Sequence, residues 1–221
     1  ACRLTEIIGP EASSKSTVGY HILAECQRIG GIGILIECEE AFETSRLKKL
    51  GINVDDLVIC QPDSMEKAFS MMDSNVIKIR KFHQGPLVIV YDSIASSPTQ
   101  AELENDYEDD TMAAAARVLS KSMRKSVRLM AENKVVLIFM NQMKKNLERY
   151  SSEPDVSYGG KALKFRASIR LKLTTRKKDL ELENKEPSGQ WVQAINIKNK
   201  IGIPFKRSRY FINFKKGIDV Y

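Results

Sequence analysis

The sequence predicts an α/β fold with a mostly parallel central sheet flanked by helices. Short apolar runs alternate with longer segments of helical periodicity over the first 142 residues. The apolar runs are continuous, which is typical of parallel strands that are buried on both faces. Beyond that point several strand-like segments follow one another, and we expect them to extend the sheet as antiparallel strands at the C-terminal edge.

The elements of the first half follow from local patterns. TEIIG (5–9) is predicted as a strand that ends in a loop, and residues 16–29 place apolar side chains at helical spacing. A second buried strand (31–40) precedes a short helix (45–51) that stops at a glycine. The third strand (55–62) is stopped by a proline.

The elements of the second half continue the alternation. Residues 64–83 form an amphipathic helix, and 85–93 form an apolar, β-branched strand. A long helix over 111–133 follows an acidic stretch and leads to a fifth strand over 134–142. The later strand-like segments, expected to form a hairpin or meander, are SIRLKLTTRK (168–177), WVQAINIKNK (191–200) and RYFINFKKG (209–217).

Length and composition favour one globular domain in a reducing compartment. The chain has 221 residues, of which 43% are hydrophobic and 29% charged, so it can bury a sizeable core. No apolar run approaches the roughly 18 residues of a membrane span. The start, ACRLTEII, shows neither an initiator Met nor a signal-peptide pattern, and we interpret residues 1–221 as a fragment that begins inside a domain. Cys2, Cys26, Cys38 and Cys60 form no CxxC pair, which favours free thiols and a cytoplasmic location.

Charge is spread unevenly along the chain. Residues 1–140 hold 16 Lys and Arg against 20 Asp and Glu, a balance of −4. Residues 141–221 hold 19 against 8, a balance of +11. A basic C-terminal part suits a polyanionic partner such as nucleic acid, and a merely solvated basic surface is the alternative.

The stretch IIGPEASSKSTVGYH (7–21) has nearly every part of a phosphate-binding loop. The consensus G-x-x-x-x-G-K-[ST] lies between a strand and a helix, and both are predicted here. In such a loop backbone N–H groups surround the anion, a lysine reaches the outer phosphates and a hydroxyl holds Mg²⁺. Gly9, Lys15 and Ser16 occupy these positions, and Thr17 follows in the first helical turn.

Ser14 departs from the loop consensus, which has glycine at this position. Glycine permits backbone conformations and close approaches that a Cβ hinders, so we expect loop strain of about 1 kcal/mol or more. The N–H contacts to an anion would survive that strain. A serine-rich turn that caps a helix, with Lys15 solvated, is the alternative interpretation.

Asp92 adds weight to the nucleotide interpretation. It ends the buried strand LVIVYDS, where a P-loop ATPase keeps the acid that orders Mg²⁺ through its water shell. The acid lies about 76 positions after Lys15 and Ser16, in the expected order of elements. A turn-capping role for Asp92 is the alternative, because Asp-Ser is a good turn pair.

Several motifs in order resemble the bacterial RecA recombinase family. GPEASSKST (9–17) is similar to its phosphate loop, LIECEEAFE (35–43) to its strand with the catalytic glutamate, and VIVYDSIAS (88–96) to its Mg²⁺-acid strand. Further similar stretches are KKLGINVDDLVICQPDS, LIFMNQMK, GGKALKFRASIRLKL and IKNKIGIPFK. The likeness runs from about residue 5 to residue 218 and implies a RecA-like P-loop NTPase core, a divergent member of the family.

The resemblance implies an ATP site with Mg²⁺. Glu39 would polarise the attacking water, although both it and Glu40 are surface charges on the alternative interpretation. Gln142 would sense the γ-phosphate rather than only cap a strand. Ser16 and Asp92 would hold the metal. The expected ATP-binding residues are Gly9, Pro10, Glu11, Ala12, Ser13, Ser14, Lys15, Ser16, Thr17, Glu43 and Arg46.

The resemblance also implies contacts outside this ATP site. Lys198 and Lys200 would reach the ATP of a neighbouring subunit in a filament; without the family they are exposed strand lysines. Two loops, roughly 102–112 and 143–161, would hold single-stranded DNA, although six acids between Glu102 and Asp110 argue against direct phosphate contact by the first. The candidate DNA-binding residues are Arg117, Arg124, Lys144, Lys145, Gly159, Gly160 and Lys161.

The departures from the family pattern concern the nucleotide site and the flanks. Besides Ser14, Arg46 stands where the family usually has a tyrosine that stacks on adenine, and arginine can also stack. Glu43 replaces a shorter acid near the adenine amino group, and MAAAA (112–116) lacks the family's glycine-containing segment. We expect the family's N-terminal docking segment and its C-terminal domain to be missing.

We therefore predict an ATP-dependent recombinase core that binds single-stranded and double-stranded DNA, self-assembles into a helical filament and acts in recombination, repair and the SOS response. A catalytically weakened paralogue that only binds or regulates is one rival, because Ser14 interrupts the loop. A hexameric helicase-type ATPase is the other; GGKALKF and KNKIGIPFK favour the recombinase.

Overall fold

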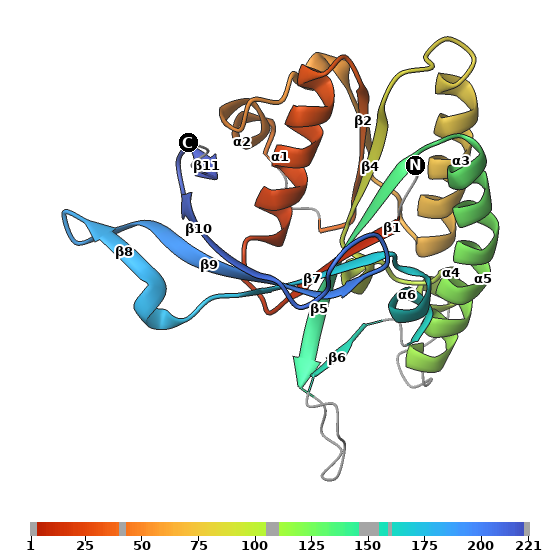
Figure 1. The fold of residues 1–221 in the computed structure, drawn as a ribbon. Coiled ribbons are helices and arrows are strands. Elements are labelled where there is room, and N and C mark those ends of the chain that lie inside the picture. Colours follow the sequence, from red (N-terminus) through yellow and green to blue (C-terminus); the bar gives the residue numbers. More distant parts are fainter. Residues whose placement is uncertain (1–3, 40–42, 105–110, 146–154, 159–160, 219–221) are drawn as a thin grey trace.

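The computed structural model describes residues 4–39, 43–104, 111–145, 155–158 and 161–218 (Figure 1). Its strands form one sheet in the order β11-β10-β9-β7-β1-β5-β4-β2-β3, with β6 paired to β5 and β8 to β9. The strands of the first half are β1 (Leu4–Gly9), β2 (Ile32–Glu37), β3 (Leu57–Cys60), β4 (Leu87–Asp92) and β5 (Val136–Lys145). The strands of the second half are β6 (Asp155–Ser157), β7 (Ile169–Thr174), β8 (Leu180–Glu183), β9 (Glu186–Asn199), β10 (Arg207–Asn213) and β11 (Gly217–Ile218).

The predicted fold class is confirmed, with one difference at the C-terminal edge. The five strands of the first half pair in parallel, and β9, β10 and β11 pair antiparallel. The strand β7, however, pairs in parallel with β1. The short helix α6 (Lys161–Arg166) precedes β7, and such a crossover lets the chain re-enter the sheet in the same direction. The antiparallel edge therefore starts one strand later than the pattern predicts.

Helices cover both faces of the sheet. Figure 1 shows α1 and α2 on one face and α3, α5 and α6 on the other. The α-helices are α1 (Lys15–Arg28), α2 (Thr44–Lys49), α3 (Met65–Ile79), α4 (Gln100–Glu104), α5 (Thr111–Glu132) and α6. The 3₁₀ turns are η1 (Val54–Asp56), η2 (Ile94–Ser96) and η3 (Lys177–Asp179). The predicted helices are thus present, with ends shifted by a few residues.

The two sheet faces carry two separate cores, because each central strand is apolar on both sides. On the α3 and α5 face, Phe69, Tyr91 and Phe139 pack their rings with centroids 5.4 to 6.1 Å apart. On the α1 face, Gly19 brings the helix close to β4 and β5, since a Cβ there would lie 2.5 Å from the Met140 terminal methyl and 3.0 Å from a Val90 methyl. The approach fixes α1, and with it the loop that precedes it, against the sheet.

Candidate functional site

The segment between β1 and α1 has the backbone of a tight anion-binding turn. Gly9 is required, because a Cβ at this position would collide with the Ser13 side chain and would lie 2.7 Å from the Leu173 carbonyl oxygen. The Ser13 hydroxyl donates to the Pro10 carbonyl at 2.7 Å, which closes the turn. The helix starts at Lys15, so the N–H groups of its first turn lie beside this segment.

Lys15 is buried inside this turn rather than solvated. Its ammonium donates to the Pro10 carbonyl at 2.8 Å. Burial lowers its pKa, while the carboxylates of Asp92 and Glu39 oppose that shift. The alternative of a helix-capping turn with a solvated lysine is therefore wrong.

Ser14 adopts the backbone conformation that the consensus glycine serves. Its φ of 65° and ψ of 29° are left-handed, and Ala12 also has a positive φ, of 55°. A non-glycine residue in this region costs of order 1 to 3 kcal/mol. The Ser14 side chain makes no capping bond to α1. Its hydroxyl instead accepts a hydrogen bond from the amide of Gln190, in β9, at 2.7 Å.

Ser16 and Asp92 form a hydroxyl–carboxylate pair where a divalent cation would bind. Asp92 ends β4 and is almost fully buried, and burial raises its pKa to about 6, opposed first by its hydrogen bond with the Ser16 side chain. The described residues contain no group of three or more His, Cys, Asp or Glu able to hold a metal alone. Mg²⁺ commonly uses one or two protein oxygens together with phosphates and waters, so this pair fits it.

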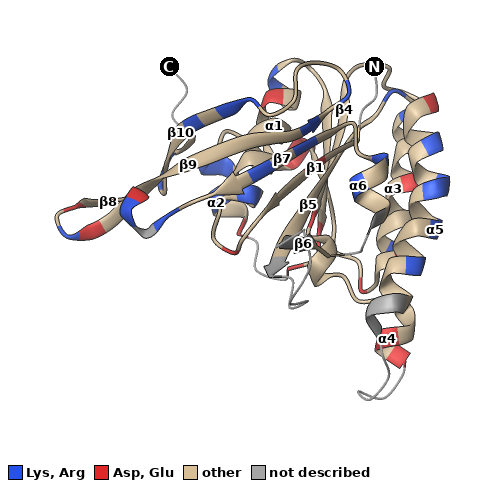
Figure 2. Ribbon diagram, turned by 60° about the horizontal axis from the view of Figure 1, so that its bottom comes forward, with Lys and Arg blue, Asp and Glu red and all other residues tan. Residues whose placement is uncertain are grey.

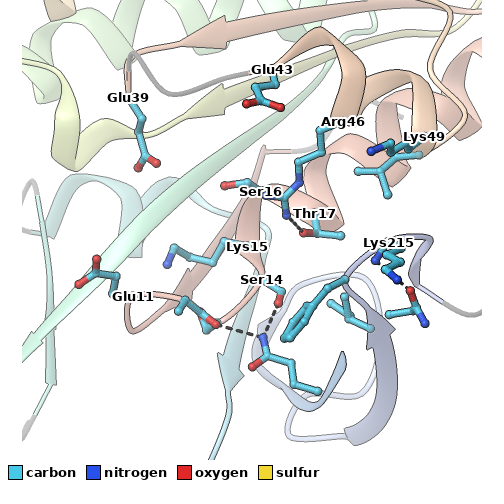
Figure 3. Close-up of a pocket in the computed structure, with 18 of the residues that line it drawn as sticks. Glu11, Ser14, Lys15, Ser16, Thr17, Glu39, Glu43, Arg46, Lys49 and Lys215 are labelled. Carbon is cyan, nitrogen blue, oxygen red and sulfur yellow. Dashed lines mark hydrogen bonds between the residues drawn. The ribbon is translucent and has the colours of Figure 1, made fainter. Parts of the chain in front are cut away.

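Glu39 faces Lys15 across the cavity (Figure 3). Its carboxylate accepts hydrogen bonds from the hydroxyls of Ser93 at 2.9 Å and Ser96 at 3.3 Å, which orient it. The backbone N–H of Glu39 donates to the carboxylate of Glu37 at 2.9 Å. Glu39 is exposed, as the surface-charge interpretation expects, but it also lines the cavity, whereas Glu40 lies outside the described residues.

Glu37 holds the backbone of Glu39 through the hydrogen bond to its N–H group. It is buried at the end of β2 and accepts a hydrogen bond from the Tyr20 hydroxyl at 3.3 Å. Burial raises its pKa to about 7, opposed by the N–H of Glu39. Nothing in its sequence context distinguished it from the apolar strand, and only its position beside Asp92 in the sheet reveals it.

A cavity of about 1010 Å³ extends from these residues to the C-terminal strands. Figure 3 shows Arg46 and Lys49 on one side of it and Lys215 on the other. The lining residues that the sequence predicted are Glu11, Ala12, Ser13, Ser14, Lys15, Ser16, Thr17, Glu39, Glu43, Arg46 and Gln142. Those that it did not predict include Leu50, Gln190, Ile212, Asn213, Phe214 and Lys215.

Arg46 and Gln142 occupy different ends of the site. The Arg46 guanidinium donates to the Thr17 hydroxyl at 3.0 Å, which places its charge at the first turn of α1. Gln142 lies in β5, in register with Gly9, and lines the cavity beside the turn.

Lys198 and Lys200 do not line this cavity. The Lys198 ammonium donates to the carbonyl oxygens of Lys164 at 2.6 Å and Phe165 at 3.0 Å, at the end of α6. Desolvation and the charges of Lys200 and Arg170 lower its pKa. A role toward the nucleotide of another subunit stays a prediction.

The predicted DNA-binding residues are only partly covered by the described residues. Arg117 and Arg124 lie on the exposed face of α5, and Figure 1 shows the start of this helix at the same end of the molecule as the end of β5. Lys144 and Lys145 end β5, and Lys161 begins α6, but their side chains lie outside the described residues, as do Gly159 and Gly160. Figure 2 shows basic residues along α5 and along β7, β9 and β10.

The described residues contain no helix that is long and apolar enough to cross a membrane. Cys26, Cys38 and Cys60 are free thiols, as predicted, and Cys2 lies outside the described residues.

Comparison with known proteins agrees with this arrangement. Residues 1–219 match the sequence model of the RecA N-terminal domain. The chain is 37% identical over 217 residues to the protein RecA of Chlorobium chlorochromatii and 36% identical over 217 residues to that of Caldanaerobacter subterraneus. It is 38% identical over 221 residues to the protein RecA of Leptospira meyeri.

Each match covers 98% of this chain but only 59%, 61% and 54% of the respective relative. The fold and the site define an α/β domain with a phosphate-loop-like turn beside a polar cavity, and the comparisons narrow the family to which it belongs. The chain belongs to the RecA family.

Proposed function

We propose that the chain is the ATPase core of a DNA recombinase, which binds single-stranded DNA with ATP bound and promotes homologous pairing and strand exchange. The observation that carries the proposal is that Lys15, Ser16 and Glu39 line one cavity, with the buried Asp92 hydrogen-bonded to Ser16 behind it. The family membership supports the same function, and 221 residues would form its core domain.

Separate groups of the site would bind the phosphates, hold the metal ion and activate the water. The turn from Gly9 to Thr17 would bind the phosphates through its N–H groups, and Lys15 would neutralise their charge. Ser16 and Asp92 would hold Mg²⁺, which supplies positive charge to the phosphate oxygens when it is bound. Glu39, oriented by Ser93 and Ser96, would orient the attacking water and accept its proton.

The nucleotide base would lie toward the C-terminal strands, between α2 and β10. Arg46 and Glu43 line this end of the cavity, and Phe214 adds an aromatic ring. The hydrogen bond to Thr17 holds the Arg46 guanidinium beside the first turn of α1 and uses one of its N–H donors. The other donors would be available to a phosphate or to a base.

DNA binding would use the end of the molecule where β5 ends and α5 begins. Contacts from Arg117, Arg124 and the two lysines at the end of β5 would go mainly to phosphate, so binding would be salt-sensitive and largely independent of sequence. A basic C-terminal part, with its balance of +11, supports attraction of single-stranded and double-stranded DNA. Filament assembly would bring Lys198 and Lys200 to the ATP of the next subunit, and the free thiols suit the cytoplasm.

The test is ATP hydrolysis with and without single-stranded DNA for the parent, Lys15→Ala and Ser14→Gly. Lys78→Ala, on the exposed face of α3, is the matched lysine control. We expect DNA-stimulated turnover that falls at least about 100-fold in Lys15→Ala and is unchanged in the control. Turnover that is absent in the parent but present in Ser14→Gly would instead favour a weakened, non-catalytic paralogue.

A further inference from the structure

A side chain from the C-terminal strands holds the phosphate loop. The amide nitrogen of Gln190, in β9, donates to the Ala12 carbonyl at 3.1 Å and to the Ser14 hydroxyl at 2.7 Å. A glutamine amide has two N–H hydrogens, and these two bonds use both. The contact joins residues 178 and 176 positions apart in the sequence.

The two residues that Gln190 contacts are the two loop residues with a strained backbone. Ala12 and Ser14 both have positive φ, of 55° and 65°, and both carry a Cβ. Between residues 9 and 17 of the described chain, no other residue has a positive φ. The clamp therefore acts at the positions where the loop would otherwise relax away from its anion-binding shape.

Gln190 can act as a clamp because β9 is fixed on both sides. Its backbone is in register with Ile212 of β10 and Leu180 of β8. Val192, two residues on and on the same face of the strand, is completely buried in the α1-side core. A side chain that projects from such a rigid element holds a definite position, whereas one on a loop does not.

We propose that Gln190 is a positioning residue that lets serine function at position 14 of the phosphate loop, by holding the left-handed turn and by orienting the Ser14 hydroxyl toward the phosphates of a bound nucleotide. Because the Ser14 oxygen accepts from Gln190, its own proton is left to donate elsewhere, and within the described residues the Ser14 hydroxyl donates to no other group. A phosphate oxygen in the cavity would supply that acceptor. The inference rests on the proposed nucleotide function.

The experiment is a double-mutant cycle with Gln190→Ala, Ser14→Gly and the double variant, each made in the 221-residue chain. Gln193→Ala is the matched control, because Gln193 lies in the same strand, on the opposite face, and its side chain makes no hydrogen bond within the described part of the chain. Gln190→Glu keeps the shape of the side chain and removes both donors. The probes are ADP and adenosine by titration calorimetry, with urea unfolding of each variant without nucleotide.

We expect Gln190→Ala and Gln190→Glu to weaken ADP about tenfold, which equals about 1.4 kcal/mol, and to leave adenosine within about twofold. In the Ser14→Gly background the same change should weaken ADP about threefold or less, because glycine adopts the left-handed turn without help. A role in folding alone would shift the urea midpoint without separating ADP from adenosine.

Two results would overturn the proposal. One is an equal loss of ADP affinity in the parent and Ser14→Gly backgrounds, which would show that Gln190 acts independently of the serine. The other is a loss no larger than that of Gln193→Ala. If neither the parent nor any variant binds ADP, the proposed nucleotide function fails. The urea midpoints then test the contact between Gln190 and the loop: non-additive shifts for Gln190→Ala and Ser14→Gly support it, and additive shifts contradict it.

Discussion

The parallel and the antiparallel parts of the sheet differ in where their charged side chains lie. In the parallel part, from β1 to β5, the polar groups that matter are few and buried at strand ends, and burial raises the pKa values of Asp92 to about 6 and Glu37 to about 7. In the antiparallel part, from β9 onward, most charged side chains are exposed, and this half of the chain carries the excess of Lys and Arg. The acids with raised pKa values are thus buried in the parallel part, whereas the excess of basic side chains is exposed in the antiparallel part.

The strand β7 joins the two parts, because it pairs in parallel with β1 and antiparallel with β9, and a few polar contacts reinforce this junction. Arg170 of β7 pairs with Glu6 of β1 at 2.5 Å, and Asn141 of β5 donates to the same carboxylate at 2.9 Å. The backbone N–H of Ile218, in β11, donates to the His21 ring of α1 at 2.8 Å. Gln190 adds the contact to the phosphate loop. If the two parts differ in this way, substitutions in the parallel core should lower the free energy of unfolding most. Substitutions at the junction should lower it less, and those at the edge least.

The largest loss of stability is expected from the aromatic core. Phe139→Ala should lower the free energy of unfolding by about 3 to 5 kcal/mol, because the Phe139 ring is fully buried between Phe69 and Tyr91. Urea unfolding measures this change. Phe82→Ala, with Phe82 74% exposed, is the control and should change little, and equal losses in the two variants would contradict the assignment of the core.

At the junction, Arg170→Ala should cost about 3 kcal/mol of unfolding free energy. The substitution leaves the Glu6 carboxylate, which is completely buried, without its charged partner. The matched control is Arg128→Ala, whose exposed partner Glu132 is solvated in either case and should leave the urea midpoint unchanged. A loss in Arg170→Ala no greater than in the control would mean that the buried pair does not join the two parts.

The His21 contact should make the junction sensitive to acid. Burial lowers the pKa of His21 below its ordinary value of 6.5, and only the neutral ring can accept from Ile218. The contact is therefore complete above pH 6.5 and is lost as the pH falls through the lower folded-state pKa, at a cost of about 1 kcal/mol.

The measurement for His21 is the difference in unfolding free energy between the parent and His21→Phe at about pH 7.5 and at about pH 5, on either side of the histidine titration. The difference is needed because the raised pKa values of Asp92 and Glu37 have the opposite sign: these carboxyls take up protons in the folded state first, which favours folding as the pH falls. We expect the parent's advantage at the higher pH to shrink at the lower one. An advantage that does not change with pH would exclude the neutral-acceptor role.

The smallest effect is expected at the β8–β9 hairpin, which Figure 1 shows projecting from the body of the molecule. Leu182→Ser should change the unfolding free energy by about 0.5 kcal/mol or less, because the Leu182 side chain is 61% exposed. Thermal or urea unfolding measures this change in free energy. A loss comparable to that of Phe139→Ala would show that the edge belongs to the cooperative core.

The sequence allowed the fold class and much of the site to be predicted because their signals are local. The loop with Lys15 and Ser16, and Asp92 at the end of an apolar strand, are patterns within single segments, and the structure brings them together. Ser14 is the loop position that departs from the consensus, and its left-handed backbone is a conformation that glycine adopts without strain.

The rest could not be predicted because it depends on sheet order. Gln190 reaches the loop only because β9 crosses beside it, and Glu37 matters only because β2 pairs with β4. The parallel pairing of β7 with β1 depends on the crossover through α6, which the strand pattern alone does not show. Such contacts join distant segments, and no local periodicity encodes them.

The most direct test of the central claim, that the polar groups at the cavity of the parallel part perform nucleotide hydrolysis, compares Glu39→Gln with Lys15→Ala in ATP binding and in turnover with single-stranded DNA. The account predicts that Glu39→Gln binds ATP within about twofold of the parent but turns over at least about 100-fold more slowly, since the amide can orient water but cannot accept its proton. Lys15→Ala should lose both properties. Unchanged turnover in Glu39→Gln would contradict the account.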